Sequence, residues 1–194
     1  MNRNALRALL PAAALAATVV ALPSASATGT PASGSVTVTA TNAFLTQELR
    51  AGIAEVPLPS ATGGYSSTAG GTATFPVTGG DAVLPRFVGS ITLGGGLAFA
   101  DGLTGKIICF HQVAFGGDTQ ALTAVPDGQS TPVTLFVLGD NTVGSGVGVT
   151  PQTLTGDADL DPSGAAYLDQ ALHTSFFTGG QIVGSLSVTF TPAS

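Results

Sequence analysis

The sequence predicts an all-β fold, a β-sandwich of short strands closed by two short helices. Three observations predict it. Short segments of alternating apolar and polar residues follow one another closely, turn residues separate them, and the 194 residues include 27 glycines and 12 prolines. The chain is 44% hydrophobic, and this excludes disorder, because disordered chains lack the apolar residues that form a core.

Residues 1–27 have the organisation of a secretory signal peptide. Arg3 and Arg7 precede an apolar run over residues 8–22, and a small-residue triplet lies directly before Thr28. The apolar run is shorter than a membrane span requires. We therefore predict a protein that is cleaved before Thr28 and secreted, without an integral membrane segment in the mature chain.

The predicted mature chain has a flexible leader of small residues over 28–34 and a single domain over 35–191. It keeps three of the five basic residues and all eleven acidic ones, a formal net charge of −8. Such a surface lacks a basic patch that could attract nucleic acids or anionic lipids. Cys109 is the single cysteine, so an intramolecular disulfide is excluded. We expect a secreted or loosely wall-associated protein with an unknown extracellular or cell-wall ligand.

The first elements follow from local patterns. Valine and threonine alternate over residues 36–39, the two-residue period of a half-buried strand. Thr41 or Asn42 then caps a short helix that runs to Arg50 and stops at Gly52. The apolar side of this helix is expected to consist of Phe44, Leu45 and Leu49.

Glycine, serine and threonine dominate residues 57–71, which we predict to be a loop. Pro76 then places the next strand at a sheet edge. Asp101-Gly102 predicts a type I′ hairpin turn, because both central positions of that turn need positive φ. The strands expected in this part cover residues 72–77, 87–93, 97–100, 106–115, 119–125 and 133–138.

After a strand over residues 153–160, Asp161 is the expected N-cap of a second helix, with Pro162 at its first position. A last strand is expected over 182–190. Residues 43–49 and 166–172 share the same apolar spacing at a constant offset of 123, which favours two layers closed by two similar helices. The apolar side of the second helix is expected to consist of Tyr167, Leu168 and Leu172.

Cys109 and His111 are two residues apart on a predicted strand and so face the same way. Both residue types bind metals, but their neighbours on that face, Ile107 and Val113, are apolar, and no other ligand lies nearby in the sequence. We interpret the pair as a buried structural cysteine beside a hydrogen-bonded histidine.

Asp157, Asp159 and Asp161 alternate in a manner that suggests a calcium loop. A loop begun at Asp157 needs glycine at its sixth position and glutamate at its twelfth, where Pro162 and Leu168 stand. We interpret these aspartates as strand residues that present carboxylates to water and end in a helix cap. No metal site is predicted.

His173 is expected at the C-terminal end of the second helix, where a cation is favoured. Tyr65 and Tyr167 carry phenols that ligate iron in some proteins, but Tyr167 is in a core-like position and Tyr65 has no neighbouring base. The sequence has no nucleophile elbow, and Gly94 to Gly96 join two strands instead of opening a phosphate-binding helix. Paired acids distant in sequence remain open, but no catalytic constellation is visible and we expect no enzyme.

Four segments resemble, in order, secreted actinobacterial proteins related to the HtaA haem-uptake domain. These segments are residues 74–80, 89–99, 135–138 and 161–168. The resemblance implies a β-sandwich with two short helices and, in the haem-binding members, a tyrosine that ligates iron with support from a histidine. The aligned positions, within 43–47 and 93–95, hold neither residue here, and the chain lacks the family's tryptophan. No haem ligand is therefore carried over.

Two hypotheses follow. The first is an exported, non-catalytic β-sandwich without a cofactor, which acts at or outside the cell envelope as a binding or surface-structural module. The second is a carrier of haem or another small ligand, with Tyr65 or His111 as the contact residue.

Overall fold

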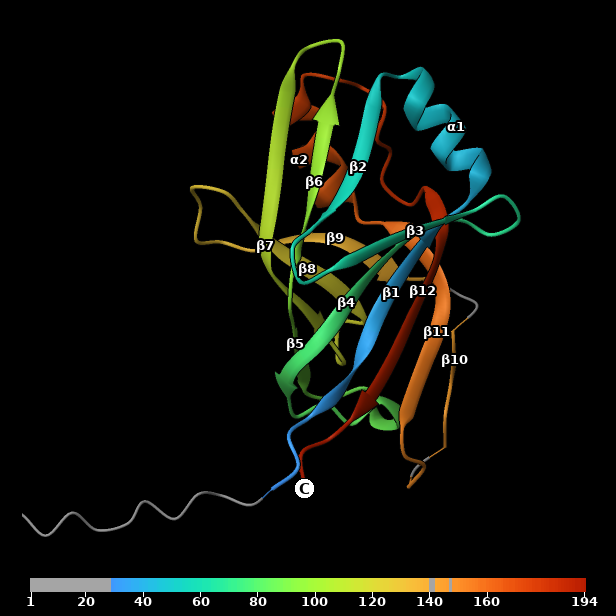
Figure 1. Cartoon of the computed structure of the whole chain (residues 1–194), viewed down its shortest axis with the longest axis vertical. Coiled ribbons are helices and arrows are strands. Elements are labelled where there is room, and N and C mark those ends of the chain that lie inside the picture. Colours follow the sequence, from blue (N-terminus) through green and yellow to red (C-terminus); the bar gives the residue numbers. More distant parts are fainter. Residues whose placement is uncertain (1–28, 140–141, 147) are drawn as a thin grey trace, which may run out of the picture.

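The computed structural model describes residues 29–139, 142–146 and 148–194. The predicted signal peptide, residues 1–27, lies outside them. Neither described helix reaches the length of a membrane-spanning helix. The elements in chain order (Figure 1) are β1 (Ser33–Ala40), α1 (Asn42–Arg50), β2 (Ile53–Leu58), β3 (Thr62–Ser66), β4 (Gly70–Gly80), the 3₁₀ helix η1 (Leu84–Arg86), β5 (Ser90–Leu93), β6 (Gly96–Asp101), β7 (Lys106–Gly116), β8 (Ala121–Pro126), β9 (Val133–Leu138), β10 (Val143–Gly144), β11 (Gln152–Leu160), α2 (Pro162–Leu172) and β12 (Ile182–Thr191).

Eight of these strands form a closed antiparallel barrel in the order β1, β4, β5, β7, β8, β9, β11, β12, and β12 pairs again with β1. The remaining strands extend it: β2 pairs with β6, and β6 pairs with β7, while β3 pairs with β4 and β10 with β11. The prediction of an all-β fold with two short helices is confirmed. Two separate stacked sheets are not observed, because the hydrogen bonds pass from strand to strand around the whole ring.

Apolar side chains from all sides of the barrel fill its interior. Among the largest fully buried ones are Phe75, Phe115, Phe136 and Phe190. Six aromatic rings are in contact from one helix to the other, with centroids 5.0 to 6.0 Å apart: Tyr167, Phe110, Phe99, Phe177, Phe176 and Phe44. Tilted and edge-on contacts of this kind add to the stabilisation from burial. They connect α2 to α1 through the protein's own side chains.

The predicted helix starts are confirmed. Thr41 caps α1, since its hydroxyl oxygen accepts from the Phe44 N–H at 3.2 Å. The Asp161 carboxylate caps α2 by accepting from the N–H groups of Ser163 and Gly164, with Pro162 at the first turn.

The predicted apolar side of α1 is partly wrong. Leu49 is 67% exposed, while Glu48 is only 1% exposed and buried with Phe44. Positions 44 and 48 are four residues apart and therefore lie on one face of a helix.

The predicted loop over 57–71 is also wrong. It contains the end of β2, all of β3 and the start of β4, and β3 and β4 form a hairpin in which Tyr65 pairs with Gly71. All five β3 residues are exposed. The hairpin is therefore defined by backbone hydrogen bonds, and the sequence of β3 shows no alternation of buried and exposed side chains that could predict it. The leader predicted over 28–34 is shorter than expected, because β1 already begins at Ser33.

Three smaller predictions need correction. Phe87 has φ of 52°, so the strand expected from that residue begins only at Ser90. The Asp101 carboxylate accepts from two N–H groups of a longer turn that ends at Gly105, with φ of 70°, so the type I′ turn is not formed. β4 lies between other strands, but Pro76 falls between the positions paired with β3 and those paired with β5, where its missing N–H is tolerated.

The two ends of the described chain lie together. β1 and β12 are antiparallel neighbours, with Ser33 opposite Thr191, and the Ser194 N–H donates to the Thr30 carbonyl at 3.1 Å. In Figure 1 this end of the barrel lies at the bottom and α1 lies at the top.

Candidate functional site

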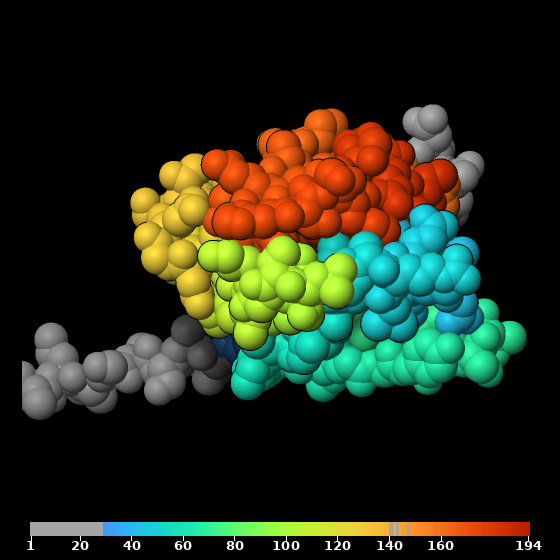
Figure 2. Space-filling model, turned by 90° about the horizontal axis from the view of Figure 1, so that it is seen from above, coloured from blue at the N-terminus to red at the C-terminus, as the bar shows by residue number. Residues whose placement is uncertain are grey.

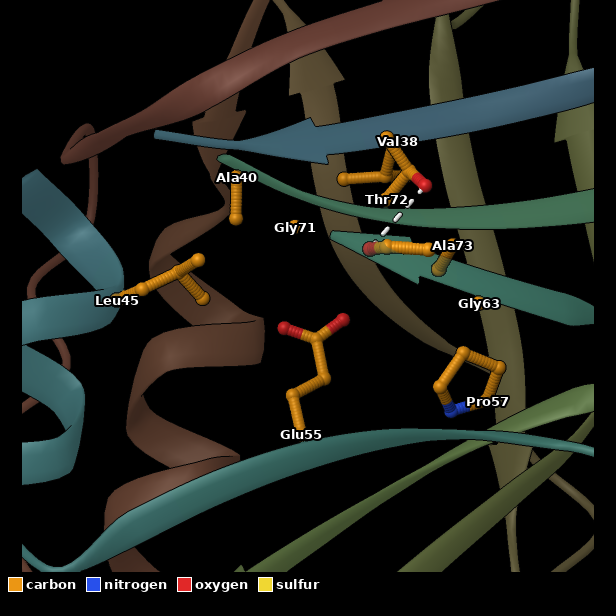
Figure 3. Close-up of a pocket in the computed structure, with 10 residues that line it drawn as sticks. Val38, Ala40, Leu45, Glu55, Pro57, Gly63, Gly71, Thr72 and Ala73 are labelled. Atoms are coloured by element: carbon orange, nitrogen blue, oxygen red, sulfur yellow. Dashed lines mark hydrogen bonds between the residues drawn. The ribbon is translucent and has the colours of Figure 1, made fainter. Parts of the chain in front are cut away.

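The sequence contains only two glutamates, Glu48 and Glu55, and the fold brings them together between α1 and β2. Glu48 lies in the last turn of α1 and is 1% exposed. Its Oε1 atom has no hydrogen-bond partner among the described residues. Glu55 is half-buried on β2, and Figure 3 shows its carboxylate directed from that strand into a cavity.

Glu55 lines two adjoining cavities. The first, of about 190 Å³, separates Glu55 from Val38 of β1 and Thr72 of β4. The second, of about 290 Å³, is lined by Glu48 on α1 and Tyr65 on β3. Both cavities include Leu45 and Glu55 in their walls. We call the two cavities together the glutamate groove, defined by Leu45, Glu48, Glu55, Tyr65 and Thr72.

The backbone around the groove explains its position. Gly52 adopts φ of 83° between α1 and β2, a conformation that glycine takes without strain. The turn is held by a hydrogen bond of 2.8 Å from the Gly102 N–H to the Gly52 carbonyl. On β4, a Cβ added at Gly71 would lie 3.2 Å from a Leu45 methyl group, so glycine at this position leaves the groove open. Figure 2, viewed from the end that carries α1, shows α1 beside the β3–β4 hairpin.

The electrostatics of the two carboxyl groups are unusual. Burial, reinforced by the charge of Glu55, raises the pKa of Glu48 from 4.5 to about 8. Burial raises the pKa of Glu55 from 4.5 to about 7. Within the described part of the chain, neither group forms an ion pair with a basic side chain. The groove is therefore a partly apolar site whose acids gain charge only near or above neutral pH.

The two residues proposed as ligand contacts lie in different places. Tyr65 is 73% exposed and lines the second cavity beside both glutamates. His111 is exposed on β7, where its Nε2 atom lies 3.0 Å from an Asp127 carboxylate oxygen. The fold brings Tyr65, and not His111, to the groove.

The prediction of a buried cysteine beside a hydrogen-bonded histidine is half correct. His111 has a partner, but its face of β7 is turned outward: Ile107 is 70% exposed and Cys109 is half-buried. Val113 is buried because a bulge intervenes, with Gln112 at φ of 50° and a register shift between His111 and Ala114. A bulge of one residue reverses which side chains face the core. No group of three or more metal-binding side chains occurs within residues 29–139, 142–146 and 148–194.

The other residues considered as possible ligands lie at positions where they contribute to the fold. Asp161 caps α2, as predicted. Asp157 and Asp159 alternate with buried residues on β11, but both are half-buried instead of being fully presented to water. His173 ends α2 with φ of 60°, and its N–H donates to the Asp169 carbonyl. The Tyr167 hydroxyl accepts from the Gln129 side-chain amide at 2.9 Å.

Neither glutamate is among the functional residues predicted from the sequence. The available signal was their rarity, two against nine aspartates, together with their position on either side of Gly52. Glu48 also follows Phe44 by one helical turn, which places an acid on the apolar face.

No protein-family model matches this sequence, and no curated protein sequence matches it significantly. A solved structure, the C-terminal domain of HtaA from Corynebacterium glutamicum, is similar with a TM-score of 0.55 and 21% sequence identity. The match covers 84% of this chain and 99% of that domain. The two proteins therefore share a fold, and this agrees with the resemblance seen in the sequence.

Proposed function

We propose that this chain is an exported, non-catalytic module that binds a small ligand in the glutamate groove. The observation that carries the proposal is the buried Glu48, with an oxygen that has no partner among the described residues. A buried polar group without a partner destabilises a fold by about 1–3 kcal/mol. Such groups are uncommon in folded proteins, and a ligand that supplies the missing hydrogen bond accounts for this one.

The pair of carboxyl groups supports binding better than catalysis. In hydrolases that use two acids, the surroundings keep one protonated and the other ionised. Here burial raises the pKa of both groups in the same direction, to about 8 for Glu48 and about 7 for Glu55, so their surroundings do not push the two values widely apart. No basic side chain of the described part of the chain holds either carboxyl group in its ionised form.

A carrier of haem is the second candidate, favoured by the position of Tyr65 in the wall of the second cavity and by the fold shared with a domain of HtaA. The residues fit haem poorly. Tyr65 has no basic neighbour in the groove, and His111 lies on the outward face of β7.

A fragment screen by ¹H–¹⁵N correlation spectroscopy tests the proposal. We expect binding fragments to shift amide signals of α1, β2 and the β3–β4 hairpin. Leu45→Phe places a larger side chain between the two cavities and should abolish these shifts. Val149→Phe adds the same ring at an exposed position outside the groove and should leave them unchanged. A screen in which no fragment shifts groove signals contradicts the proposal.

Haemin distinguishes the two candidates. A Soret shift on titration that is lost in Tyr65→Phe and kept in His111→Ala supports the carrier. Groove shifts with fragments, but no Soret shift with haemin, support the module without haem.

A further inference from the structure

We infer that the glutamate groove binds a small organic cation, an ammonium or guanidinium group on a short apolar stem. This inference rests on the proposed function and adds the chemical class of the ligand.

The first step is charge. Glu48 and Glu55 line one cavity together, and the described basic side chains leave both without an ion pair. Even Arg50, on the same helix as Glu48, forms none with either acid. A buried carboxyl group either keeps its proton or, once ionised, needs an opposite charge beside it. A bound cation provides that pair, and a charged donor also satisfies the free Oε1 atom of Glu48.

The second step is the apolar wall. Leu45, Leu49 and Ala54 line the second cavity beside the two carboxyl groups. A cavity of about 290 Å³ has room for an alkyl stem as well as a charged head. Calcium prefers about six to eight oxygen ligands, whereas the described residues hold no cluster of three metal-binding side chains. The lining therefore favours an organic cation over a metal ion.

Other titratable groups come from the elements around the pair. Tyr65 on β3 lines the groove, and Asp101 on β6 lies against Gly52. His173 begins the connection whose Phe176 packs on Phe44, while β1 and β4 carry no titratable residue. Because the cation needs ionised carboxylates, its affinity should increase as the two glutamates lose their protons between about pH 6 and pH 9.

The probe is n-butylammonium, which stays protonated below about pH 10, and n-butanol is its neutral counterpart. Binding is followed by the amide shifts of α1 and β2. We expect n-butylammonium to bind about tenfold more tightly than n-butanol at about pH 9, and Glu48→Gln and Glu55→Gln each to weaken it about tenfold. Asp127→Asn removes one charge at an exposed site and should leave affinity unchanged.

Each other outcome overturns the inference. Equal affinity for n-butanol and n-butylammonium makes the groove a site for neutral ligands and leaves the proposed function standing. Tighter binding of calcium chloride than of n-butylammonium makes it a metal site. Absence of n-butylammonium binding refutes the organic cation, whereas the proposed function falls only if the fragment screen is also negative.

Discussion

Replacement of Glu48 by glutamine should stabilise the fold by an amount that increases with pH. Glutamine has the shape of a protonated glutamic acid but does not ionise. In the folded protein burial raises the pKa of Glu48 from 4.5 to about 8. Below about pH 4.5 the side chain is protonated in both states, so the wild type and the variant should differ little there.

The sign follows from which state loses its proton first. As the pH rises above 4.5, the unfolded chain ionises while the folded protein keeps the Glu48 proton until about pH 8. The wild type therefore loses stability through this window and reaches a plateau above it. Each pKa unit corresponds to about 1.4 kcal/mol. The expected gain from Glu48→Gln is then about 3 kcal/mol at pH 7 and about 5 kcal/mol above pH 8.

Urea unfolding followed by circular dichroism, at several pH values between about 4 and 9, measures this difference. A gain of about 3 kcal/mol is a large part of the 5–15 kcal/mol typical of a domain, so the midpoint should move clearly. Asp118→Asn serves as the control, because Asp118 is exposed and forms no ion pair with another described residue. Curves for the wild type and Glu48→Gln that stay parallel over the whole pH range would show that Glu48 is not buried as described.

Three further changes test the scaffold. Asp161→Ala should lower the free energy of unfolding in urea by about 1 kcal/mol because α2 loses its cap, whereas Asp161→Asn should retain most of that stability. Gln152→Leu removes the acceptor of a buried hydrogen bond of 2.7 Å from the η1 backbone and should cost about 1–3 kcal/mol, whereas an unchanged midpoint would contradict that bond. Gly184→Ala puts a methyl group 1.8 Å from the Thr39 carbonyl oxygen, so thermal melts should show loss of the folded state. Gly146→Ala, with no atom within 4 Å, should melt like the wild type.

Helix starts could be predicted from the sequence because short-range chemistry determines them. Thr41 and Asp161 cap their helices through N–H groups two or three residues further on, and such spacings are visible in the chain. Strand positions could also be predicted in large part, since alternation identifies a strand wherever one face is buried.

The orientation of α1 could not be predicted in the same way. Hydrophobicity assigns Leu49 to the core and Glu48 to water, and the structure has the reverse. The inward face of α1 packs beside Glu55 and the groove, which come together only in the folded chain. The sequence pattern of α1 therefore does not identify the acids of the site.

Two other features lack a side-chain signal. The β3–β4 hairpin is exposed and rich in glycine, so its strand pairing rests on the backbone. The bulge at Gln112, partway along β7, reverses which of the following side chains face the core. Closure of the sheet into a barrel also could not be predicted from the sequence pattern, because a barrel and a sandwich both require strands with one apolar face.

The neighbouring positions of Thr30 and Ser194 have a practical consequence. An affinity tag at the C-terminus would lie at the end of the barrel away from α1 (Figure 1), and so would a sensor chip that captures the protein through this tag. Immobilised through its C-terminus, the protein would present α1 to the flowing buffer. A short linker between these residues would also permit circular permutation, with new termini opened elsewhere on the surface.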